Sequence, residues 1–284
     1  LHIESFRAGD GYLTTSTEYQ LKRMFAGGFE RLYTLTQNFR AGDLGSRHNP
    51  EFTMLEWARA YASLGDIERD AEALVRRALA ALDPDATSVT YAGHTVEVCG
   101  SAWERLSVRE ALERHLGVSP DECFSLASMR AETERLGLEI PAGYRDDAVD
   151  LLTVLLDRAQ PKLGTRVPTF LVDWPSSLTT SAPPRAGAPH VAERSELFIA
   201  GVEVADGFPF LRDAALQARL FEESNARRLA AGRMPVRLDT RYVEALRAAL
   251  PPGAGMAMGV DRLVMVLTGE DDIRNVLAFA WDEL

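Results

Sequence analysis

The chain has 284 residues, 46% of them hydrophobic, and a formal net charge of −11 at pH 7. This length and composition suffice to bury a large core, so we expect one large domain with an insertion. The acidic balance argues against a broad phosphate-binding surface, although a local patch could still bind a nucleic acid.

The sequence also indicates the cellular compartment of the protein. No stretch is apolar enough to span a bilayer, and the chain, which begins at Leu1, shows no signal-like segment. We therefore expect a cytoplasmic protein without membrane contacts. Cys99 and Cys123 lack metal-ligand spacing, which indicates reduced thiols rather than a disulfide or a zinc site.

Residues 15–28 predict the first helix. A threonine or serine at 15–17 can cap it, Glu18 lies in its first turn, and Gly27 follows its last turn. A carboxylate near a helix start is favoured in its ionised form. Taken alone, a capped helix with an acidic first turn needs no function to explain it.

A long hairpin is expected next. Residues 33–40 alternate between polar and apolar, residues 52–57 form a second strand-like run, and the segment between them contains two glycines. This pattern predicts two antiparallel strands joined by a long loop.

The hairpin gathers candidate ligand-binding side chains. The strands carry Arg40 and Glu56, and the loop brings Arg47 and His48 over the sheet. Cations beside the ring of Phe52 suit an anionic ligand that carries a flat ring, such as a nucleoside triphosphate. The alternative is a solvated hairpin with ordinary surface charges.

The pattern becomes mainly helical from about 62 to 160, apart from a small hairpin expected around Ala92 and Gly93. Residues 169–175 form an apolar run stopped by proline, which predicts a buried central strand. Residues 181–190 are rich in proline, alanine and glycine and are expected to form a mobile loop near the site.

Two acidic residues suggest a metal site. Glu196 and Glu203 lie on either side of a turn expected at Gly201, so a tight hairpin could bring both carboxylates towards one spot. Carboxylates that face phosphate oxygens are the ligands that Mg²⁺ prefers. The alternative is a pair of solvated carboxylates on the wet face of a strand.

A glycine-rich run at 253–259 precedes a helix that contains Arg262. Its glycines allow the backbone to approach a ligand closely, and Arg262 could reach a triphosphate. Taken alone, such a turn is weak support for nucleotide binding.

Four segments in this order resemble one family. They are TSTEYQLKR, the FR of residues 39–40 with RHNPEFTMLEW, then PTFLVDWP, and finally GAGMAMGVDR. They are similar to motif 2, motif 3 and neighbouring segments of class II aminoacyl-tRNA synthetases, in the form used by lysyl-tRNA synthetases and their short paralogue, the elongation factor P beta-lysine ligase.

The resemblance implies an α+β fold. Residues 1–284 would form a class II synthetase-like catalytic domain, with a mainly antiparallel sheet of six or seven strands flanked by helices and a helical insertion at about 62–160. The family's motif 1, which builds much of the dimer interface, is absent from this chain. A homodimer is therefore expected by analogy alone.

The resemblance also implies a reaction. The amino-acid carboxylate would attack the α-phosphorus of ATP in the presence of Mg²⁺, releasing pyrophosphate and forming an aminoacyl-adenylate. The roles implied are Arg40 for the α-phosphate and the substrate carboxylate, His48 and Arg262 for the outer phosphates, Phe52 for adenine stacking, Glu196 and Glu203 for Mg²⁺, Glu18 for the α-amino group, and Glu56 for the amino-acid or ribose side.

Several positions depart from the family pattern. The family's adenine-reading glutamate is missing after Arg40, so adenine recognition could move to Asp43 or to backbone groups. Phe210 stands where the family has the glutamate that pairs with the ammonium of a lysine substrate, and Asp206 replaces an asparagine. Ala58 replaces an aromatic residue with a hydroxyl group.

These departures predict a pocket altered from the lysine type. Asp206 could receive a cation from another direction, or Phe210 and Ala58 could form a more apolar pocket for a larger or uncharged amino acid. Ala257 resembles the beta-lysine ligase rather than the tRNA enzymes, which have glycine there. The acyl acceptor would be a protein such as elongation factor P, a carrier or a small molecule.

Two other functions stay open. Charging of tRNA is disfavoured by the acidity of the chain and by the absence of an anticodon-binding domain. A non-catalytic, amino-acid-sensing paralogue is favoured by the lost adenine-reading and lysine-reading glutamates. The retained cations and acidic pair argue against a sensor, which has no need of a triphosphate site.

Overall fold

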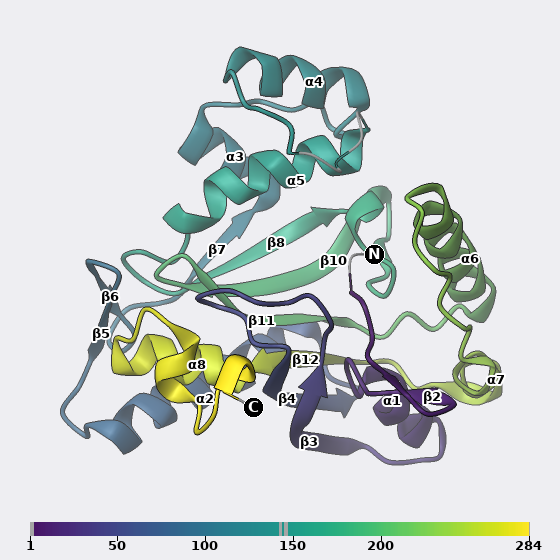
Figure 1. Ribbon diagram of the computed structural model, residues 1–284, viewed down its shortest axis with the longest axis horizontal. Coiled ribbons are helices and arrows are strands. Elements are labelled where there is room, and N and C mark those ends of the chain that lie inside the picture. The colour runs from purple at the N-terminus through teal and green to yellow at the C-terminus, as the bar shows by residue number, and fades with distance from the viewer. Residues whose placement is uncertain (1–2, 142–143, 145–146, 284) are drawn as a thin grey trace.

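The computed structural model describes residues 3–141, 144 and 147–283 (Figure 1). Within this part of the chain the main sheet has eight strands, in the order β3-β4-β12-β11-β10-β8-β7 with β9 beside β10. The strands are β3 (Arg31–Phe39), β4 (Glu51–Ala60), β12 (Gly253–Gly259), β11 (Val202–Pro209), β10 (Ala188–Ile199), β8 (Thr169–Pro175), β7 (Glu104–Ser107) and β9 (Pro184–Arg185).

All neighbouring strands are antiparallel except β7 and β8, which are parallel. The expected mainly antiparallel α+β architecture is therefore confirmed. The strand at residues 169–175 also forms and is buried, as predicted, and it lies inside the sheet, between β10 and the edge strand β7.

The predicted long hairpin is formed by β3 and β4, with Thr34 opposite Glu56 and Tyr33 opposite Trp57. The backbone N–H of Arg40 donates to the carbonyl of Pro50 at 2.9 Å and closes the base of the connecting loop. Alternation of polar and apolar residues was sufficient to predict this hairpin, although the apolar side chains of Tyr33 and Leu35 in β3 are exposed.

The first predicted helix is α1 (Glu18–Ala26), preceded by the short strands β1 (Arg7–Ala8) and β2 (Gly11–Tyr12). Thr17 occupies the N-cap position, but its side chain does not cap the helix. Its hydroxyl instead hydrogen-bonds to Glu56 and to Thr34. The cap residue thus ties the helix start to the sheet.

Helices cover the two faces of the sheet differently. On one face α2 (Leu64–Leu82) and α8 (Val260–Thr268) share a core with the side chains of Met256 and Met258. On the other face α1 and α7 (Thr240–Ala249) pack around Ala58 and Phe210. Side chains alternate along a strand, so Met256 and Met258 of β12 point to the first layer and Ala257 between them points to the second.

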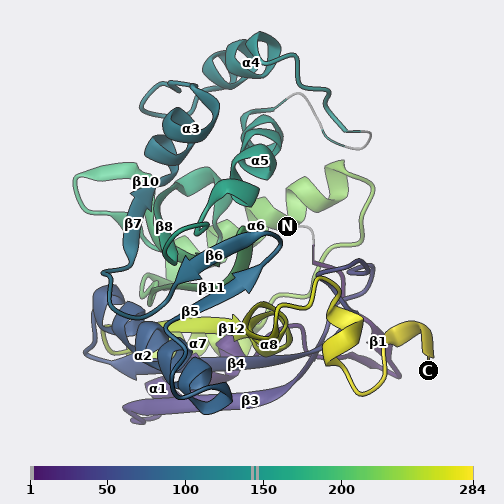
Figure 2. The ribbon, with the colours of Figure 1, turned by 90° about the vertical axis from the view of Figure 1, so that its left-hand side faces the viewer.

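The remaining helices lie at the ends of the sheet. Figures 1 and 2 both place α3 (Val108–Leu116), α4 (Leu126–Arg135) and α5 (Ala148–Ala159) together beyond β7 and β8. The helix α6 (Ala214–Ala230) precedes α7. Short 3₁₀ helices occupy Gln160–Lys162, Ser176–Leu178, Ile273–Val276 and Trp281–Glu283.

The range 62–160 holds the predicted hairpin, β5 (Ser88–Tyr91) and β6 (His94–Glu97), with positive φ at Ala92 and Gly93. It also contributes β7 to the main sheet. A separate helical insertion with these bounds therefore stays a prediction. Among the described residues, no helix combines the length and apolar character that crossing a membrane requires.

The prediction of a loop at residues 181–190 was wrong in part. The strand β9 pairs with the start of β10, with Arg185 opposite Ala188, and the guanidinium of Arg185 binds the carboxylate of Asp173 at 3.0 Å. The high content of proline and glycine concealed a short hairpin, because such residues are also typical of tight turns.

Candidate active site

Four neighbouring strands place one residue each in a row on the open face of the sheet. Glu196 is opposite Asp206, Asp206 is opposite Ala257, and Ala257 is opposite Glu56. Residues opposite one another in a sheet project from the same face. We call these four residues the acidic row.

A second row runs parallel to the first, two residues further along the strands. Phe208 is opposite Gly255, which is opposite Ala58. A Cβ atom on Gly255 would lie 2.9 Å from the Cβ of Ala58, so glycine is needed to let these strands pack. We call these three residues the apolar row, and Phe210 extends it along the chain.

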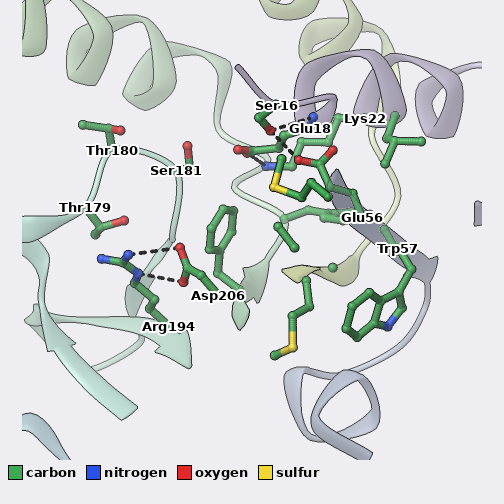
Figure 3. A pocket seen from close by; sticks show the side chains of 18 of the residues that line it. Ser16, Glu18, Lys22, Glu56, Trp57, Thr179, Thr180, Ser181, Arg194 and Asp206 are labelled. Atoms are coloured by element: carbon green, nitrogen blue, oxygen red, sulfur yellow. Dashed lines mark hydrogen bonds and ion pairs between the residues drawn. The ribbon is translucent and has the colours of Figure 1, made fainter. Parts of the chain in front are cut away.

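The rows form the floor of two adjoining cavities. The inner cavity, about 290 Å³ in volume, is lined by Glu18, Lys22, Glu56, Ala58 and Phe210 among others (Figure 3). The outer cavity, about 330 Å³, is lined by residues of the predicted phosphate and metal sites, namely Asp43, Arg47, His48, Phe52, Glu196, Glu203 and Arg262. The structure therefore brings all the sequence-predicted site residues together.

Arg40 lies at the junction and lines both cavities, as do Asp206 and Ala257. Its Nε atom is buried and has no hydrogen-bond partner among the described residues. Its guanidinium lies 5.1 Å from the ring centroid of Phe52. Burial lowers the pKa of Arg40, and the carboxylate of Asp43 opposes this effect. A half-buried cation of this kind suits an anionic ligand.

The cations of the outer cavity are linked to one another. Arg262 donates to the backbone carbonyls of Arg47 at 3.1 Å and Glu203 at 3.0 Å, and its Nη2 lies 2.5 Å from Nε2 of His48. Burial, and then the charge of Arg262, lower the pKa of His48. A neutral His48 that accepts at Nε2 carries its proton on Nδ1, which can donate to a ligand.

A bulge aligns the acidic residues of the hairpin. The chain turns at Ala200 and Gly201, both with positive φ, and the register between β10 and β11 shifts at Leu197 and Phe198. Glu203 and Asp206 are three residues apart, so a regular strand would send them to opposite faces. The extra residue in β11 lets both line the outer cavity.

The predicted metal ligands Glu196 and Glu203 both line the outer cavity. Burial raises the pKa of Glu196 well above its usual value, Arg194 opposes this, and Glu203 adds to it. A divalent cation would relieve that repulsion, so the two carboxylates fit Mg²⁺ whose other ligands come from phosphate and water. Among the described residues, no group of three or more metal-ligating side chains is present.

Arg194, which was not predicted from the sequence, engages Asp206. Its Nε and Nη2 donate to the two carboxylate oxygens of Asp206 at 2.8 and 3.0 Å (Figure 3). Its Nη2 also lies 2.6 Å from Glu196. Both oxygens of Asp206 therefore already bind a cation. This gives no support to the alternative in which Asp206 receives a substrate cation.

The inner cavity holds two further carboxylates. Glu18 accepts from the ammonium of Lys22 at 2.6 Å, and Glu56 accepts from the hydroxyl of Ser16 at 2.5 Å and from that of Thr17. Burial raises the pKa of Glu56, and these two hydroxyl groups oppose the rise. The binding of a substrate α-amino group by Glu18 stays a prediction. The carboxylate of Glu18 already pairs with Lys22.

Sequence reasoning also missed Lys22, although its position four residues after Glu18 was visible. Such spacing is typical of an exposed helical ion pair. Here Lys22 is 3% exposed and lines the inner cavity. Arg194 could have been noticed from its place two residues before Glu196, which puts both side chains on one face of a strand.

Comparison of the sequence with those of known proteins identifies the family of the chain. A model of "tRNA synthetases class II (D, K and N)" matches residues 2–283. The lysine–tRNA ligase of Magnetococcus marinus is 36% identical over 270 residues, covering 95% of this chain and 53% of that protein. The corresponding ligase of Chromohalobacter salexigens is 38% identical over 272 residues, with the same coverage.

A shorter relative is covered more completely. The elongation factor P–(R)-beta-lysine ligase of an Enterobacter species is 34% identical over 272 residues, covering 95% of this chain and 78% of that protein. The chain spans about half the length of the lysine–tRNA ligases that it matches. With the family model matched almost from end to end, the chain belongs to the class II tRNA synthetases of the D, K and N type.

Proposed function

We propose that this protein is an ATP-dependent ligase that activates an amino acid as its adenylate and transfers the aminoacyl group to a protein acceptor. The observation that carries the proposal is the place of Arg40. A half-buried guanidinium, whose buried Nε has no hydrogen-bond partner in the described part of the chain, stands where the two cavities meet. The carboxylate of an amino acid in the inner cavity and the α-phosphate of ATP in the outer cavity would meet at this cation.

The proposed reaction is an in-line displacement. A carboxylate oxygen of the amino acid attacks the α-phosphorus of ATP, the bond to the bridging oxygen breaks, and pyrophosphate leaves. Arg40 would hold both reacting groups and neutralise charge that develops between them. Arg262 and His48 would hold the outer phosphates, and no covalent enzyme nucleophile is needed.

Glu196 and Glu203 would hold Mg²⁺, which when bound neutralises phosphate charge. Phe52 would stack on adenine, with Asp43 as a neighbouring acceptor; both line the outer cavity. In the inner cavity Glu56, with Glu18 beside it, would receive the α-ammonium, because Glu56 takes its hydrogen bonds from neutral hydroxyl groups.

The acceptor we propose is a lysine amine of an elongation factor P-like protein. The support is the relative named elongation factor P–(R)-beta-lysine ligase, of which this chain covers 78%. The net charge of −11 gives a tRNA backbone little to bind. Charging of tRNA is the second candidate, because relatives named lysine–tRNA ligases match 95% of the chain. A homodimer and a cytoplasmic location belong to the same proposal.

Amino-acid-dependent exchange of labelled pyrophosphate into ATP tests the proposal. The panel comprises the proteinogenic amino acids, (R)-beta-lysine and ornithine, each with ATP and Mg²⁺. We expect exchange with at least one of them and none with the Arg40→Met variant. Absence of exchange with every member, together with absence of ATP binding by calorimetry, would favour an amino-acid sensor over a ligase.

A second step identifies the acceptor. The wild-type protein is incubated with ATP, the activated amino acid and either elongation factor P or total tRNA, and the mass of each acceptor is measured. We expect a mass increase on the protein acceptor. An increase on tRNA alone would replace the proposed acceptor while leaving adenylate formation in place.

A further inference from the structure

The loop between α6 and α7 exposes apolar side chains on a backbone that is held in place. Met234 is 80% exposed and Val236 is 54% exposed. The side chain of Asn225 donates from Nδ2 to the carbonyl of Val236 and accepts at Oδ1 from the N–H of Val236, both at 2.8 Å. Nε of Arg228 donates to the carbonyl of Met234 at 2.9 Å. These hydrogen bonds fix the backbone of residues 229–237, which we call the α6–α7 loop.

Positive charge is concentrated around the α6–α7 loop. Residues 225–241 contain five arginines and one acidic residue, Asp239, in a chain whose net charge is −11. The carboxylate of Asp239 accepts from the N–H of Tyr242 at 3.0 Å and so caps α7. Arg237 and Arg241 are exposed. The loop and its flanks therefore form a cationic and partly apolar patch on an acidic protein.

The helix α6 connects this patch to the inner cavity. Nε2 of Gln217 donates to the carbonyl of Thr180 at 3.0 Å. Arg228, which is 5% exposed, donates from Nη1 to the carbonyl of Ile3 at 3.1 Å. Thr180 and Ile3 both line the inner cavity, and Figure 1 shows α6 beside the N-terminal end of the described chain. The α6–α7 loop is thus anchored next to the proposed amino-acid site.

The side chains of the loop indicate the kind of partner. Methionine and arginine are enriched in protein–protein interfaces, which have an apolar centre and a polar rim. A nucleic acid backbone is bound mainly by cations and polar groups, and it offers Met234 and Val236 no apolar surface. An acidic protein surface matches both features, because opposite charges steer the encounter and apolar contacts then retain the complex.

We propose that the α6–α7 loop is the docking surface for the acyl acceptor, and that the acceptor is a protein whose contacting face is acidic around an apolar centre. The proposal rests on the proposed function, since it takes the acceptor to be a protein. None of residues 229–237 lines either cavity, so the loop binds the acceptor and takes no part in adenylate formation.

The double variant Met234→Glu, Arg237→Glu tests the docking surface. It places negative charge on the loop and removes its most exposed apolar side chain. With the amino acid that supports pyrophosphate exchange, we expect exchange within twofold of the wild type. We expect kcat/KM for transfer to elongation factor P to fall at least about tenfold, mainly through KM, because the loop contributes to binding rather than to chemistry.

A matched variant controls for net charge. Leu82→Glu combined with Arg77→Glu makes the same change of charge on exposed residues of α2, where Leu82 is 57% exposed. This control should transfer to elongation factor P at the wild-type rate. An equal loss in the two variants would assign the effect to the total charge of the protein and would overturn the proposal.

The remaining outcomes separate the proposal from the function on which it rests. Wild-type transfer that the loop variant leaves unchanged would refute the docking surface alone. Exchange by the wild type without transfer to elongation factor P would remove the protein acceptor and the docking surface together, and absence of exchange would remove the ligase as well. If the loop variant lowers aminoacylation of total tRNA instead, the patch binds nucleic acid.

Two further measurements complete the test. Light scattering of the wild type and the loop variant checks whether a second copy of the chain covers the loop, and a change of oligomeric state would replace the acceptor by that copy. If the loop variant loses exchange, Arg237→Glu combined with Arg241→Glu takes its place, because both arginines are exposed. The same selective loss of transfer is expected from it.

Discussion

The guanidinium of Arg194 binds both carboxylate oxygens of Asp206, at 2.8 and 3.0 Å, and also lies 2.6 Å from Glu196. Its carbon Cζ lies 4.6 Å from the ring centroid of Trp174. The guanidinium of Arg194 thus forms ion pairs with two carboxylates of the acidic row. Removing it would leave Glu196, which is 4% exposed, beside Asp206 and Glu203 without compensation.

Arg194→Met is therefore expected to lower the free energy of unfolding by about 3 kcal/mol, as the loss of one partner from a buried ion pair does. Urea denaturation followed by fluorescence measures the change. Arg185→Met is the matched control, because its pair with Asp173 is half-exposed and should contribute about 1 kcal/mol or less. Equal losses from the two variants would show that Arg194 has no special structural role.

Arg40→Met should separate function from stability. The variant replaces a half-buried cation whose buried Nε lacks a partner among the described residues, so it is expected to raise the free energy of unfolding by about 1 kcal/mol. The same change should abolish pyrophosphate exchange. Thermal denaturation and the exchange assay check both expectations, and a less stable variant would mean that Arg40 is well compensated in the free protein.

Arg262→Ala is expected to lower the exchange rate by about a hundredfold or more, because the cation of motif 3 would no longer stabilise phosphate charge. Arg274→Ala is the control, since that arginine is exposed and pairs with Asp272 outside both cavities. A rate within twofold of wild type for Arg262→Ala, measured at saturating ATP, would remove Arg262 from the phosphate site.

The pH dependence of stability should contain a contribution from His48. Burial and Arg262 lower its pKa, while Asp43 and Glu203 oppose them and Arg40 adds to them. Between the lowered pKa and the ordinary value of about 6.5, the unfolded state binds more protons at this position. This contribution therefore destabilises the fold as the pH falls through that range.

His48→Gln removes this contribution and should lose less stability than the wild type between pH 7 and pH 5. The raised pKa values of Glu56 and Glu196 act in the opposite direction, since they favour the folded state at lower pH. The comparison of the two proteins cancels those groups. Parallel stability curves from urea denaturation at each pH would show that His48 titrates normally.

Phe210→Glu combined with Ala58→Tyr tests the pocket that is altered from the lysine type. Both residues line the inner cavity, so the new carboxylate could receive the ammonium of a lysine side chain and the new hydroxyl group could hydrogen-bond to it. We expect lysine-dependent pyrophosphate exchange to rise by about tenfold or more. An unchanged preference among the amino acids would argue against the altered pocket.

The hairpin of β3 and β4, the helix α1 and the turn at Ala200 and Gly201 were accessible from the sequence, because alternation, an acidic first turn, a glycine after the last turn and turn residues act locally. The resemblance to the family supplied the residues that now line the two cavities. The position of Asp206 relative to Glu203 was not accessible, because a single extra residue in β11 decides which face each occupies.

The partners of the site residues were also beyond the sequence. Whether Thr17 caps a helix or donates to Glu56 depends on a contact between residues 39 positions apart. Lys22 is only four residues from Glu18, but its burial beside the inner cavity depends on the packing of α1 against the rest of the fold. Competition among hydrogen-bond donors for one carboxylate is settled by packing. Local sequence patterns indicate which donors could bind a carboxylate but not which of them does.

The acidic row and the apolar row occupy alternate outward positions of the same three strands, β11, β12 and β4. A substitution at Phe208, Gly255 or Ala58 can reshape the pocket wall while the strand register that positions Asp206, Ala257 and Glu56 is preserved. The chemical step and the choice of amino acid are thus set at interleaved positions. A scaffold of this kind can acquire a new substrate by drift at one set of positions while selection holds the other constant.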